Sequence, residues 1–453
     1  MTFRTIATLA AVTSLIATVA DAPSAQTTPT IKFTDTKLKN GLRVIVAEDH
    51  HAPVYSIAVH YKAGSRDERQ GRTGFAHLFE HMMFKGSENV GPGEHFMLVF
   101  THGGSMNGTT NKDRTLYFET LPANQLDLGI FLEADRMRSL EITKDNLDNQ
   151  RNAVQEERRL GVDNQPYGKT FELVDELAYD NPAYEHSVIG SMADLNAASV
   201  EDVASFFKTY YAPNNAVLAI VGDVDTKTAL EKVRKAFEAI PAQPAPPQVD
   251  LSEPKQTAER RQSLDDALAR LARVDIVYKV PPRLTPDDDA LQVLGTVLSS
   301  GRSSRLYQQI VREQQLSPNV NAGRDGAIGP GLFRVTGTVA PGKTIEALEA
   351  AIYAEIDKVK NGTIAEWEIE KARSNAKRAV VGGLTSSLTR AIQLAEYAAS
   401  YGDPSLINQR VDRVAQVTAA DVQRVARTYL VPENRTVVIT RPKSGSSSSG
   451  GAQ

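Results

Sequence analysis

Two histidines and a glutamate lie close together in the run His77-Leu78-Phe79-Glu80-His81. The surrounding residues 73–85 are rich in apolar side chains, which predicts a largely buried helix. Residues four positions apart share one face of a helix, so both imidazoles lie on the same side and Glu80 lies at the edge of that face. This order of residues is the inverted zinc-binding motif. The alternative is a helix that carries two ordinary histidines and no metal.

A catalytic zinc ion needs three protein ligands and an open position for water, whose pKa it lowers to about 7. His77 and His81 supply two ligands, so the motif lacks a third. Glu80 would take a proton from the water and pass it to the leaving amine. The motif therefore predicts zinc-dependent hydrolysis with Glu80 as the catalytic base.

The composition excludes several other kinds of function. The chain has 453 residues and a formal net charge of -4, from 51 basic and 55 acidic residues, so it lacks the basic excess of nucleic-acid-binding proteins. It contains no cysteine, so any metal ligands must be His, Asp or Glu. All eight histidines lie between His50 and His186. Only the first part of the chain can therefore carry a histidine-based metal site, and we expect no nucleic-acid partner.

Residues 1–25 have the organisation of a secretory signal peptide. Arg4 precedes an apolar run over residues 6–20, and small residues follow up to Ala25. The run is shorter than the ~20 residues that span a bilayer, which argues against the alternative of a transmembrane anchor. We expect cleavage after Ala25 or Ala22, a location in a bacterial periplasm and no stable membrane insertion.

Two distant stretches match at a constant offset, which indicates an internal duplication. Residues 199–215 and 418–434 share a Ser or Thr helix cap, an acidic residue three positions later and a Tyr, Pro and Asn before an apolar strand. A weaker match pairs residues 57–62 with residues 274–279. Strand patterns open each copy and long helical patterns follow without strict βαβ alternation, which predicts an α+β class with two tandem domains.

The duplication and the composition of the chain suggest domain limits. We assign residues 30–240 to a first, metal-binding domain and residues 273–443 to a second domain without a metal site. Residues 241–272 form a linker that begins with a proline-rich stretch. The Ser/Gly-rich residues 444–453 are predicted to be a disordered tail.

Residues 74–86, which contain the motif, closely resemble the pitrilysin/insulinase family of zinc metallopeptidases, in particular its mitochondrial-processing-peptidase-like branch. Residues 103–122, 151–157 and 182–195 resemble further segments of the family. The likeness spans nearly the whole chain after the signal peptide. It implies two homologous domains, each a mostly antiparallel sheet packed with helices, and a zinc endopeptidase or oligopeptidase that cuts peptides or unfolded chains.

The resemblance also implies the third zinc ligand. Residues 151–157 are similar to the helix that supplies this ligand in the family, and Glu157 rather than Glu156 matches it, 76 residues beyond His81. The residues alone leave the two glutamates open, and a solvated helix face is the alternative for both. One Zn2+ per chain is thus expected on His77, His81 and Glu157. Gln150 stands where the family usually has a second glutamate.

The second copy cannot repeat the metal site. Its residues at the motif positions are Gln292, Gly295 and Thr296. Residues 303–313 resemble the family segment whose arginine reaches across a chamber to the substrate and the developing oxyanion, and Arg312 matches that arginine. An ordinary surface charge is the alternative for Arg312. The family tyrosine seven residues later is replaced by Asn319, so this chain alone lacks one group of the family's site.

In the family, an extended peptide adds as a strand to a sheet edge near the zinc. Residues 103–110 would supply this edge, with Gly103, Gly104 and Asn107 as the substrate-binding residues, and a plain Asn-Gly turn is the alternative. Chains of this size carry two of the four domains of a closed chamber, which implies a homodimer or a heterodimer with a related subunit. The rival functions are a catalytically silent structural subunit and a module that binds peptides without cutting them.

Overall fold

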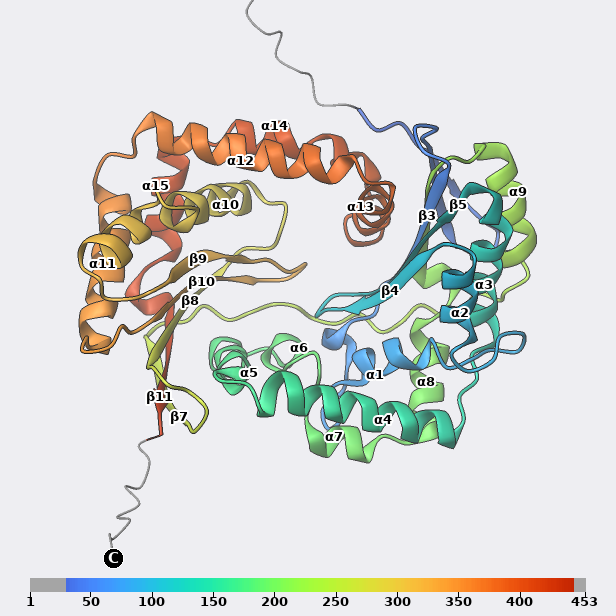
Figure 1. Ribbon diagram of the computed structural model, residues 1–453, viewed down its shortest axis with the longest axis horizontal. Coiled ribbons are helices and arrows are strands. Elements are labelled where there is room, and N and C mark those ends of the chain that lie inside the picture. The colour runs from blue at the N-terminus through green and yellow to red at the C-terminus, as the bar shows by residue number, and fades with distance from the viewer. Residues whose placement is uncertain (1–29, 444–453) are drawn as a thin grey trace, which may run out of the picture.

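Two β-sheets form the framework of the structure, a computed structural model that describes residues 30–443 (Figure 1). The strands of the six-stranded sheet are β1 (Thr34–Lys37), β2 (Arg43–Glu48), β3 (Val54–Tyr61), β4 (Ser105–Thr110), β5 (Thr115–Pro122) and β6 (Ala216–Gly222). The strands of the five-stranded sheet are β7 (Arg260–Asp266), β8 (Arg273–Val280), β9 (Val320–Asp325), β10 (Gly331–Thr338) and β11 (Arg435–Pro442). The predicted signal peptide and the predicted tail lie outside the described residues.

The two sheets repeat one topology. The strand order is β1-β2-β6-β3-β5-β4 in the first sheet and β7-β11-β8-β10-β9 in the second. Each sheet has one parallel pair, β2 with β6 and β7 with β11, among antiparallel neighbours. The registers also agree, because Ile57 lies opposite Ile220 and their counterparts Val274 and Ile439 lie opposite each other. The predicted α+β fold of two homologous, mostly antiparallel domains is confirmed.

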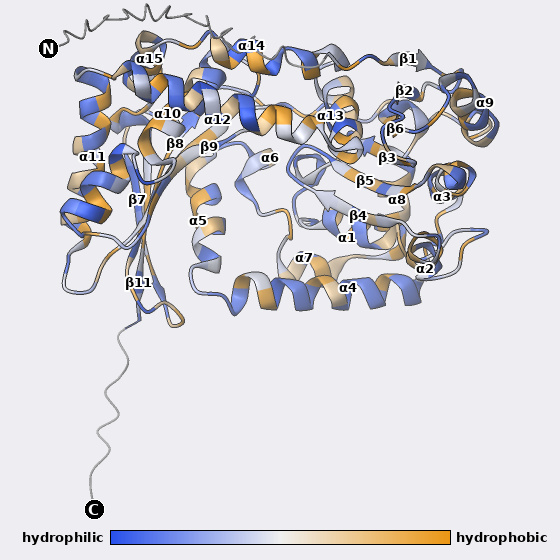
Figure 2. Ribbon diagram, turned by 45° about the horizontal axis from the view of Figure 1, so that its top comes forward, coloured by the Kyte–Doolittle hydropathy of each residue, from blue (hydrophilic) through white to orange (hydrophobic). Residues whose placement is uncertain are grey.

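Helices cover both sheets. The helices of the first part are α1 (Phe75–Met82), α2 (Glu94–Thr101), α3 (Leu126–Ser139), α4 (Lys144–Arg158), α5 (Gly168–Ala178), α6 (Pro182–Glu185), α7 (Met192–Ala197), α8 (Val200–Tyr210) and α9 (Thr226–Phe237). Those of the second part are α10 (Pro286–Ser299), α11 (Ile345–Asn361), α12 (Glu366–Leu384), α13 (Ser387–Ser400), α14 (Arg410–Ala415) and α15 (Ala419–Tyr429). Figure 2 shows mixed hydrophilic and hydrophobic residues along outer helices such as α9 and α11, as expected of amphipathic helices. Within residues 30–443, no helix combines the length and the apolar character that crossing a bilayer requires.

The central strands are buried on both faces. In β2, Val44 and Val46 belong to the core beneath the helices of the first domain, whereas Ile45 and Ala47 point to the opposite face and pack with α13. Successive side chains of a strand point to opposite faces, so a sheet covered on both sides needs a continuous apolar run. Residues 44–47 of β2 form such a run.

One helix of each domain packs on the sheet of the other domain. Helix α13 of the second part packs on β3 and β6, where Leu394 is fully buried. Helix α5 of the first part packs on β8 and β11, where Val174 is fully buried. Figure 1 shows α13 between the end of α12 and the first sheet. The exchange makes each domain part of the core of the other.

The second sheet begins inside the segment that we assigned to the linker. Residues 241–259 contain neither helix nor strand, but β7 lies within residues 241–272 and pairs along its length with β11. Its sequence is rich in charged residues and most of its side chains are partly or fully exposed, because β7 is an edge strand. It therefore lacks the apolar alternation by which a strand is predicted.

Candidate metal centre

Helix α1 is built to present one polar face. It begins after Gly74, whose φ of +88° favours glycine and where a Cβ would lie 2.6 Å from the Ile189 carbonyl oxygen. The buried carboxylate of Glu68 accepts hydrogen bonds from the Gly74 and Ala76 N–H groups at 2.8 and 2.7 Å, which satisfies two free donors of the first turn. The residues that bury the apolar face are Phe75, Ala76, Leu78, Phe79 and Met82.

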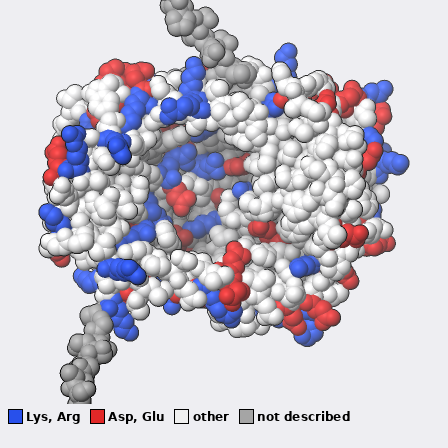
Figure 3. All heavy atoms as spheres, viewed as in Figure 1, with Lys and Arg blue, Asp and Glu red and all other residues white. Residues whose placement is uncertain are grey.

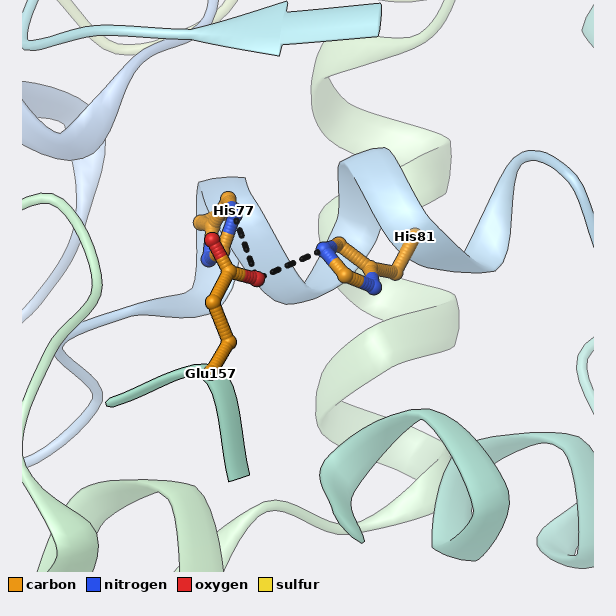
Figure 4. A group of neighbouring side chains, drawn as sticks. All are labelled: His77, His81 and Glu157. Atoms are coloured by element: carbon orange, nitrogen blue, oxygen red, sulfur yellow. Dashed lines mark ion pairs between the residues drawn. The ribbon is translucent and has the colours of Figure 1, made fainter. Parts of the chain in front are cut away.

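The opposite face of α1 meets α4 at three side chains. The Glu157 Oε2 atom lies 3.6 Å from His77 Nε2 and 3.3 Å from His81 Nε2 (Figure 4). One ligand atom from each residue lies within 4.8 Å of the others. A tetrahedral zinc ion with bonds of about 2.0–2.1 Å holds its ligand atoms about 3.3 Å apart. The three side chains therefore fit a zinc ion with little rearrangement.

The charges of these groups suit a metal. Burial and the neighbouring His81 lower the pKa of His77 to about 4, and Glu157 offsets this only in part. The hydrogen bond with His81 lowers the pKa of the Glu157 carboxyl. Near neutral pH the site thus offers a neutral imidazole and an ionised carboxylate, the forms that bind zinc. The buried His77 Nδ1 has no hydrogen-bond partner among residues 30–443.

Glu80 lies beside this group, against the edge strand of the first sheet. Thr110 Oγ1, at the end of β4, donates a 2.6 Å hydrogen bond to Glu80 Oε2. A Cβ on Gly108 would lie 3.0 Å from Glu80 Cγ, so the glycine lets β4 approach the carboxylate. Burial raises the pKa of Glu80, and the bond from Thr110 opposes this rise. A raised pKa helps a carboxylate both to accept and to return a proton. The sequence predicted that residues 103–110 form a substrate edge but did not predict the contact of Thr110 with Glu80.

The neighbours of Glu157 on α4 face elsewhere. Glu156 is exposed and forms a 3.0 Å ion pair with Arg159. Gln150 is buried and donates a hydrogen bond to Asn149. Of the two glutamates that the residues alone left open, the structure places Glu157 beside the histidines.

The three residues named for substrate binding lie at the start of β4 and along it. Among the residues that the structure describes, β4 pairs only with β5, so it is an edge strand. Gly103 has a φ of +79° in the turn before the strand, and a Cβ on Gly104 would lie 2.6 Å from Leu121 Cδ2. Asn107 is exposed, and its Oδ1 accepts a 2.9 Å hydrogen bond from the Gly108 N–H. The two glycines serve the turn and the packing, whereas Asn107 is free to meet a ligand at the edge.

The second domain has a cavity where the first has its histidines. The cavity measures about 420 Å³, and its lining includes Gln292, Gly295 and Thr296. Gln292 accepts a 3.0 Å hydrogen bond from Arg410, and a Cβ on Gly295 would lie 3.1 Å from the Gly323 Cα.

Arg312 lies apart from the metal centre of its own chain. It belongs to a π-helical segment, Tyr307–Glu313, which packs near α11 and β9 in the second domain. Its side chain is exposed and donates a 3.0 Å hydrogen bond to Gln308. Asn319 is exposed as well. The structure does not bring Arg312 together with the residues of α1 and α4.

A second group of potential ligands was not found from the sequence. His95, Glu119 and Glu133 are all buried, and one ligand atom of each lies within 4.8 Å of the others. The guanidinium of Arg136 is buried with them and pairs with Glu133. This group thus already contains a cation. Its residues are far apart in the sequence and have no motif spacing.

The repeated α+β domains and the inverted histidine motif define the class of two-domain metallopeptidase folds. Residues 43–191 match the family model described as Insulinase (Peptidase family M16), and residues 197–376 match the model described as Peptidase M16 inactive domain. The chain belongs to peptidase family M16, as the resemblance of residues 74–86 implied.

Named relatives cover nearly the whole chain. The zinc protease PqqE of Helicobacter pylori is 31% identical over 414 residues, which are 91% of this chain and 93% of the relative. A probable mitochondrial-processing peptidase subunit beta of Arabidopsis thaliana is 25% identical over 410 residues, 87% of this chain and 76% of the relative. The chain is therefore also similar to a mitochondrial-processing peptidase subunit, at a lower sequence identity than to PqqE.

Solved structures share the fold. A protease from Helicobacter pylori superposes with a TM-score of 0.87 at 31% identity and covers 91% of this chain and 100% of its own. The first half of the periplasmic protease PqqL from Escherichia coli gives a TM-score of 0.73 at 18% identity, covering 91% of this chain and 92% of its own. A peptidase M16 inactive domain from Pseudomonas fluorescens gives 0.80 at 17% identity, with 92% and 99% covered. The last two show the fold alone.

Proposed function

We propose that this chain is a zinc-dependent endopeptidase or oligopeptidase that hydrolyses peptides or unfolded polypeptides. His77, His81 and Glu157 would hold one Zn2+ per chain, and Glu80 would be the catalytic base. The observation that carries the proposal is the approach of Glu157 Oε2 to both imidazoles, with Glu80 next to them. The names of the relatives in family M16 support it.

Side chains of α1 and β4 have separate roles in the proposed hydrolysis. A bound zinc ion supplies Lewis acidity that brings the pKa of water to about 7. Glu80 takes the proton of the attacking water and delivers it to the nitrogen of the leaving amine. Thr110 keeps the Glu80 carboxylate in place through its 2.6 Å hydrogen bond. The burial that raises the pKa of Glu80 makes its carboxylate a stronger base toward the attacking water.

The free edge of β4 provides the binding surface for the substrate. An extended peptide that adds to β4 pairs with main-chain groups, which gives affinity with little side-chain selectivity. Gly103 and Gly104 shape the turn that starts this edge, and Asn107 is exposed on it. Gly108 and Thr110 bring the same strand against Glu80. The scissile bond is thereby presented beside the base.

Assembly and location complete the proposal. Arg312 is exposed and lies apart from the metal centre of its own chain, so it would act across a dimer, in the site of a partner chain. The partner is a second copy or a related subunit, as the name of the Arabidopsis subunit beta suggests for that protein. The predicted signal peptide and the likeness to a periplasmic protease support a periplasmic location.

The alternative is a catalytically silent subunit that binds peptides or supports an active partner. Asn319 in place of the family tyrosine favours it, because one group of the family's site is missing from this chain. A chain of this kind would keep the fold and the zinc ligands without hydrolysing peptides alone.

The test is hydrolysis of a mixed set of quenched-fluorescent peptides by the purified mature chain. The proposal predicts cleavage that a chelator abolishes, and a fall in kcat of about 10²- to 10⁴-fold in Glu80→Gln with zinc retained. Activity that is unchanged in Glu80→Gln contradicts the role of Glu80. A wild-type chain that binds zinc but cleaves nothing supports the silent-subunit alternative.

A further inference from the structure

The two domains meet at the turn of the β4–β5 hairpin. The loop between β9 and β10 donates two hydrogen bonds from its main chain: Ile328 N–H to Asp113 Oδ2 at 2.8 Å, and Gly329 N–H to the Tyr184 hydroxyl at 2.9 Å. The Tyr184 hydroxyl in turn donates to Asp113 Oδ1 at 2.7 Å. Asp113 is 9% exposed and Tyr184 is 1% exposed, so water competes little for these bonds. Figure 1 shows β4 and the β9–β10 hairpin pointing toward each other at the centre of the molecule.

The first domain holds the same turn from the other side. Arg66 Nη1 donates to Asp113 Oδ1 at 2.9 Å, and the Ser65 N–H donates to the Asn111 carbonyl at 3.1 Å. A Cβ on Gly64 would lie 2.5 Å from the Arg114 nitrogen, so the two backbones are in direct contact. The turn, residues 111–114, is therefore clamped between residues 64–66 of the first domain and residues 328–329 of the second.

The clamped turn is connected to the catalytic base. Arg114 Nη1 donates to the Thr109 carbonyl at 2.7 Å and to Thr109 Oγ1 at 2.6 Å, which fixes the end of β4. The next residue, Thr110, holds Glu80 Oε2 at 2.6 Å. Because β4 has a partner strand on one side only among residues 30–443, the bonds that hold its end contribute to its position.

The junction borders the central hollow of the molecule. Figure 3 shows a hollow between the two halves with Lys, Arg, Asp and Glu side chains on its wall. A cavity of about 250 Å³ at this place is lined by residues 110–114 of the first domain and residues 325–328 of the second. At the hairpin turn, the second domain thus contacts the side of the hollow on which Glu80 lies.

We propose that the second domain positions the catalytic base and the substrate edge through this junction, with Asp113 and Tyr184 as positioning residues. The loop between β9 and β10 holds the turn, and the turn holds Thr110 against Glu80. The metal-free domain is then part of the catalytic apparatus and not only a wall of the chamber. The expected effect on kcat rests on the proposed hydrolysis. The positioning of β4 by the second domain can be tested without any activity.

A matched pair of tyrosines provides the main test. Tyr184→Phe removes the hydroxyl that joins Gly329 to Asp113. Tyr179→Phe is the control, because the Tyr179 hydroxyl donates to the Pro330 carbonyl of the same loop at 3.2 Å and not to the turn. The variant keeps the Tyr179 ring, whose centroid lies 4.7 Å from Lys112 Nζ of the turn. Both rings are buried, and their centroids lie 5.5 Å apart, so the two substitutions perturb the same region of the core.

Two readouts on the full mature chain separate positioning from general stability. In zinc-free protein, hydrogen exchange of the amides of residues 105–115 is expected to rise about tenfold in Tyr184→Phe and to stay unchanged in Tyr179→Phe. In zinc-loaded protein, kcat is expected to fall about tenfold in Tyr184→Phe only, with zinc content unchanged, because small displacements of catalytic groups reduce rates strongly. Equal effects of the two variants on both readouts would overturn the proposal.

A double-mutant cycle tests whether the effect passes through Thr110. Asp113→Asn and Thr110→Val are each expected to lower kcat by about 10- to 100-fold. If Asp113 acts through Thr110, the double variant is no slower than the slower single variant, whereas independent effects multiply. Multiplying effects contradict the inference. If wild-type protein cleaves no peptide, the proposed function fails, and the exchange experiment still decides whether the second domain holds the hairpin.

Discussion

At the scale of single residues, the metal centre depends on which side of α4 a carboxylate faces. Glu156 and Glu157 are neighbours of similar exposure, with 57% and 50% of their side chains accessible. Only Glu157 lies beside both imidazoles, because consecutive helix positions point about 100° apart. The two residues thus form a natural pair for testing the ligand set.

Glu157→Gln is expected to weaken zinc binding by at least about 100-fold, since even the outer partners of zinc ligands contribute 10- to 100-fold. Glu156→Gln should bind zinc as wild type does. Zinc titration against a competing chelator measures both affinities. Equal zinc affinity of the two variants would remove Glu157 from the ligand set.

The buried group around Glu119 predicts a dependence of stability on pH. Complete burial raises the pKa of Glu119 to about 7 from an ordinary value of 4.5, although the nearby Arg136 opposes this rise. Burial lowers the pKa of His95 to about 3 and raises that of Glu133. Between pH 4.5 and 7 the folded chain keeps a proton on Glu119 that the unfolded chain has released. The contribution of Glu119 to stability therefore falls as the pH rises through this window.

The amide that replaces the carboxyl in Glu119→Gln has no proton to lose. The free energy of unfolding of this variant should therefore rise relative to that of wild type as the pH rises. The gain between pH 4.5 and pH 8 is expected to be as much as about 3 kcal/mol. Denaturant unfolding of both proteins at the two pH values measures it. Parallel behaviour of the two proteins would show that the Glu119 carboxyl is ionised in the folded state throughout this range.

At the scale of elements, the duplication allows β4, the strand beside Glu80, to be compared with its counterpart β9. Gly108 of β4 lies beside Glu80, whereas β9, the corresponding strand of the second sheet, has a glycine one position further along, Gly323. A Cβ on Gly108 would lie 3.0 Å from Glu80 Cγ, and a Cβ on Gly323 would have no atom within 4 Å. The same glycine-to-alanine substitution in the two corresponding strands should therefore have different consequences.

Gly108→Ala is expected to displace the Glu80 carboxylate and to lower kcat by about tenfold. Gly323→Ala should leave kcat unchanged. Steady-state kinetics with circular dichroism as a control for folding compares the two. If Gly323→Ala slows hydrolysis as much as Gly108→Ala does, the contact with Glu80 is not the cause.

Much of the element structure was predictable, because local signals mark it. The Ser199 and Thr418 caps accept hydrogen bonds from Asp202 and Asp421 N–H groups at 3.1 and 3.2 Å, and their helices begin at the next residue, as predicted. Strand β7 was missed because an exposed edge strand needs no apolar alternation. Thr110 was missed because its role depends on the pairing of β4 beside α1, which no local pattern encodes.

At the scale of the whole molecule, the exchange of α5 and α13 joins the two domains. The apolar face of a helix indicates that the helix packs on something, but it does not indicate on which sheet, so the sequence could not predict the exchange. The role proposed for Arg312 could not be predicted from its own segment either, because that role would depend on a partner chain. Loss of packing beneath α13 should therefore affect both domains.

Leu394→Ala removes a fully buried side chain between α13 and the first sheet, and is expected to cost about 2–5 kcal/mol. Helix α13 belongs to the second part of the chain but packs on the first sheet. We therefore expect Leu394→Ala to unfold in one cooperative transition, at a lower temperature than wild type. Differential scanning calorimetry records it. Two separate transitions in wild type would show that the exchange does not couple the domains.

The most direct test of the account is a titration of zinc into metal-free wild-type chain while peptide hydrolysis is followed. The account predicts that activity rises with added zinc and stops rising at one zinc per chain, and that Glu80→Gln takes up the same amount without activity. Zinc uptake by wild-type protein without hydrolysis, or hydrolysis that does not respond to zinc, would contradict it.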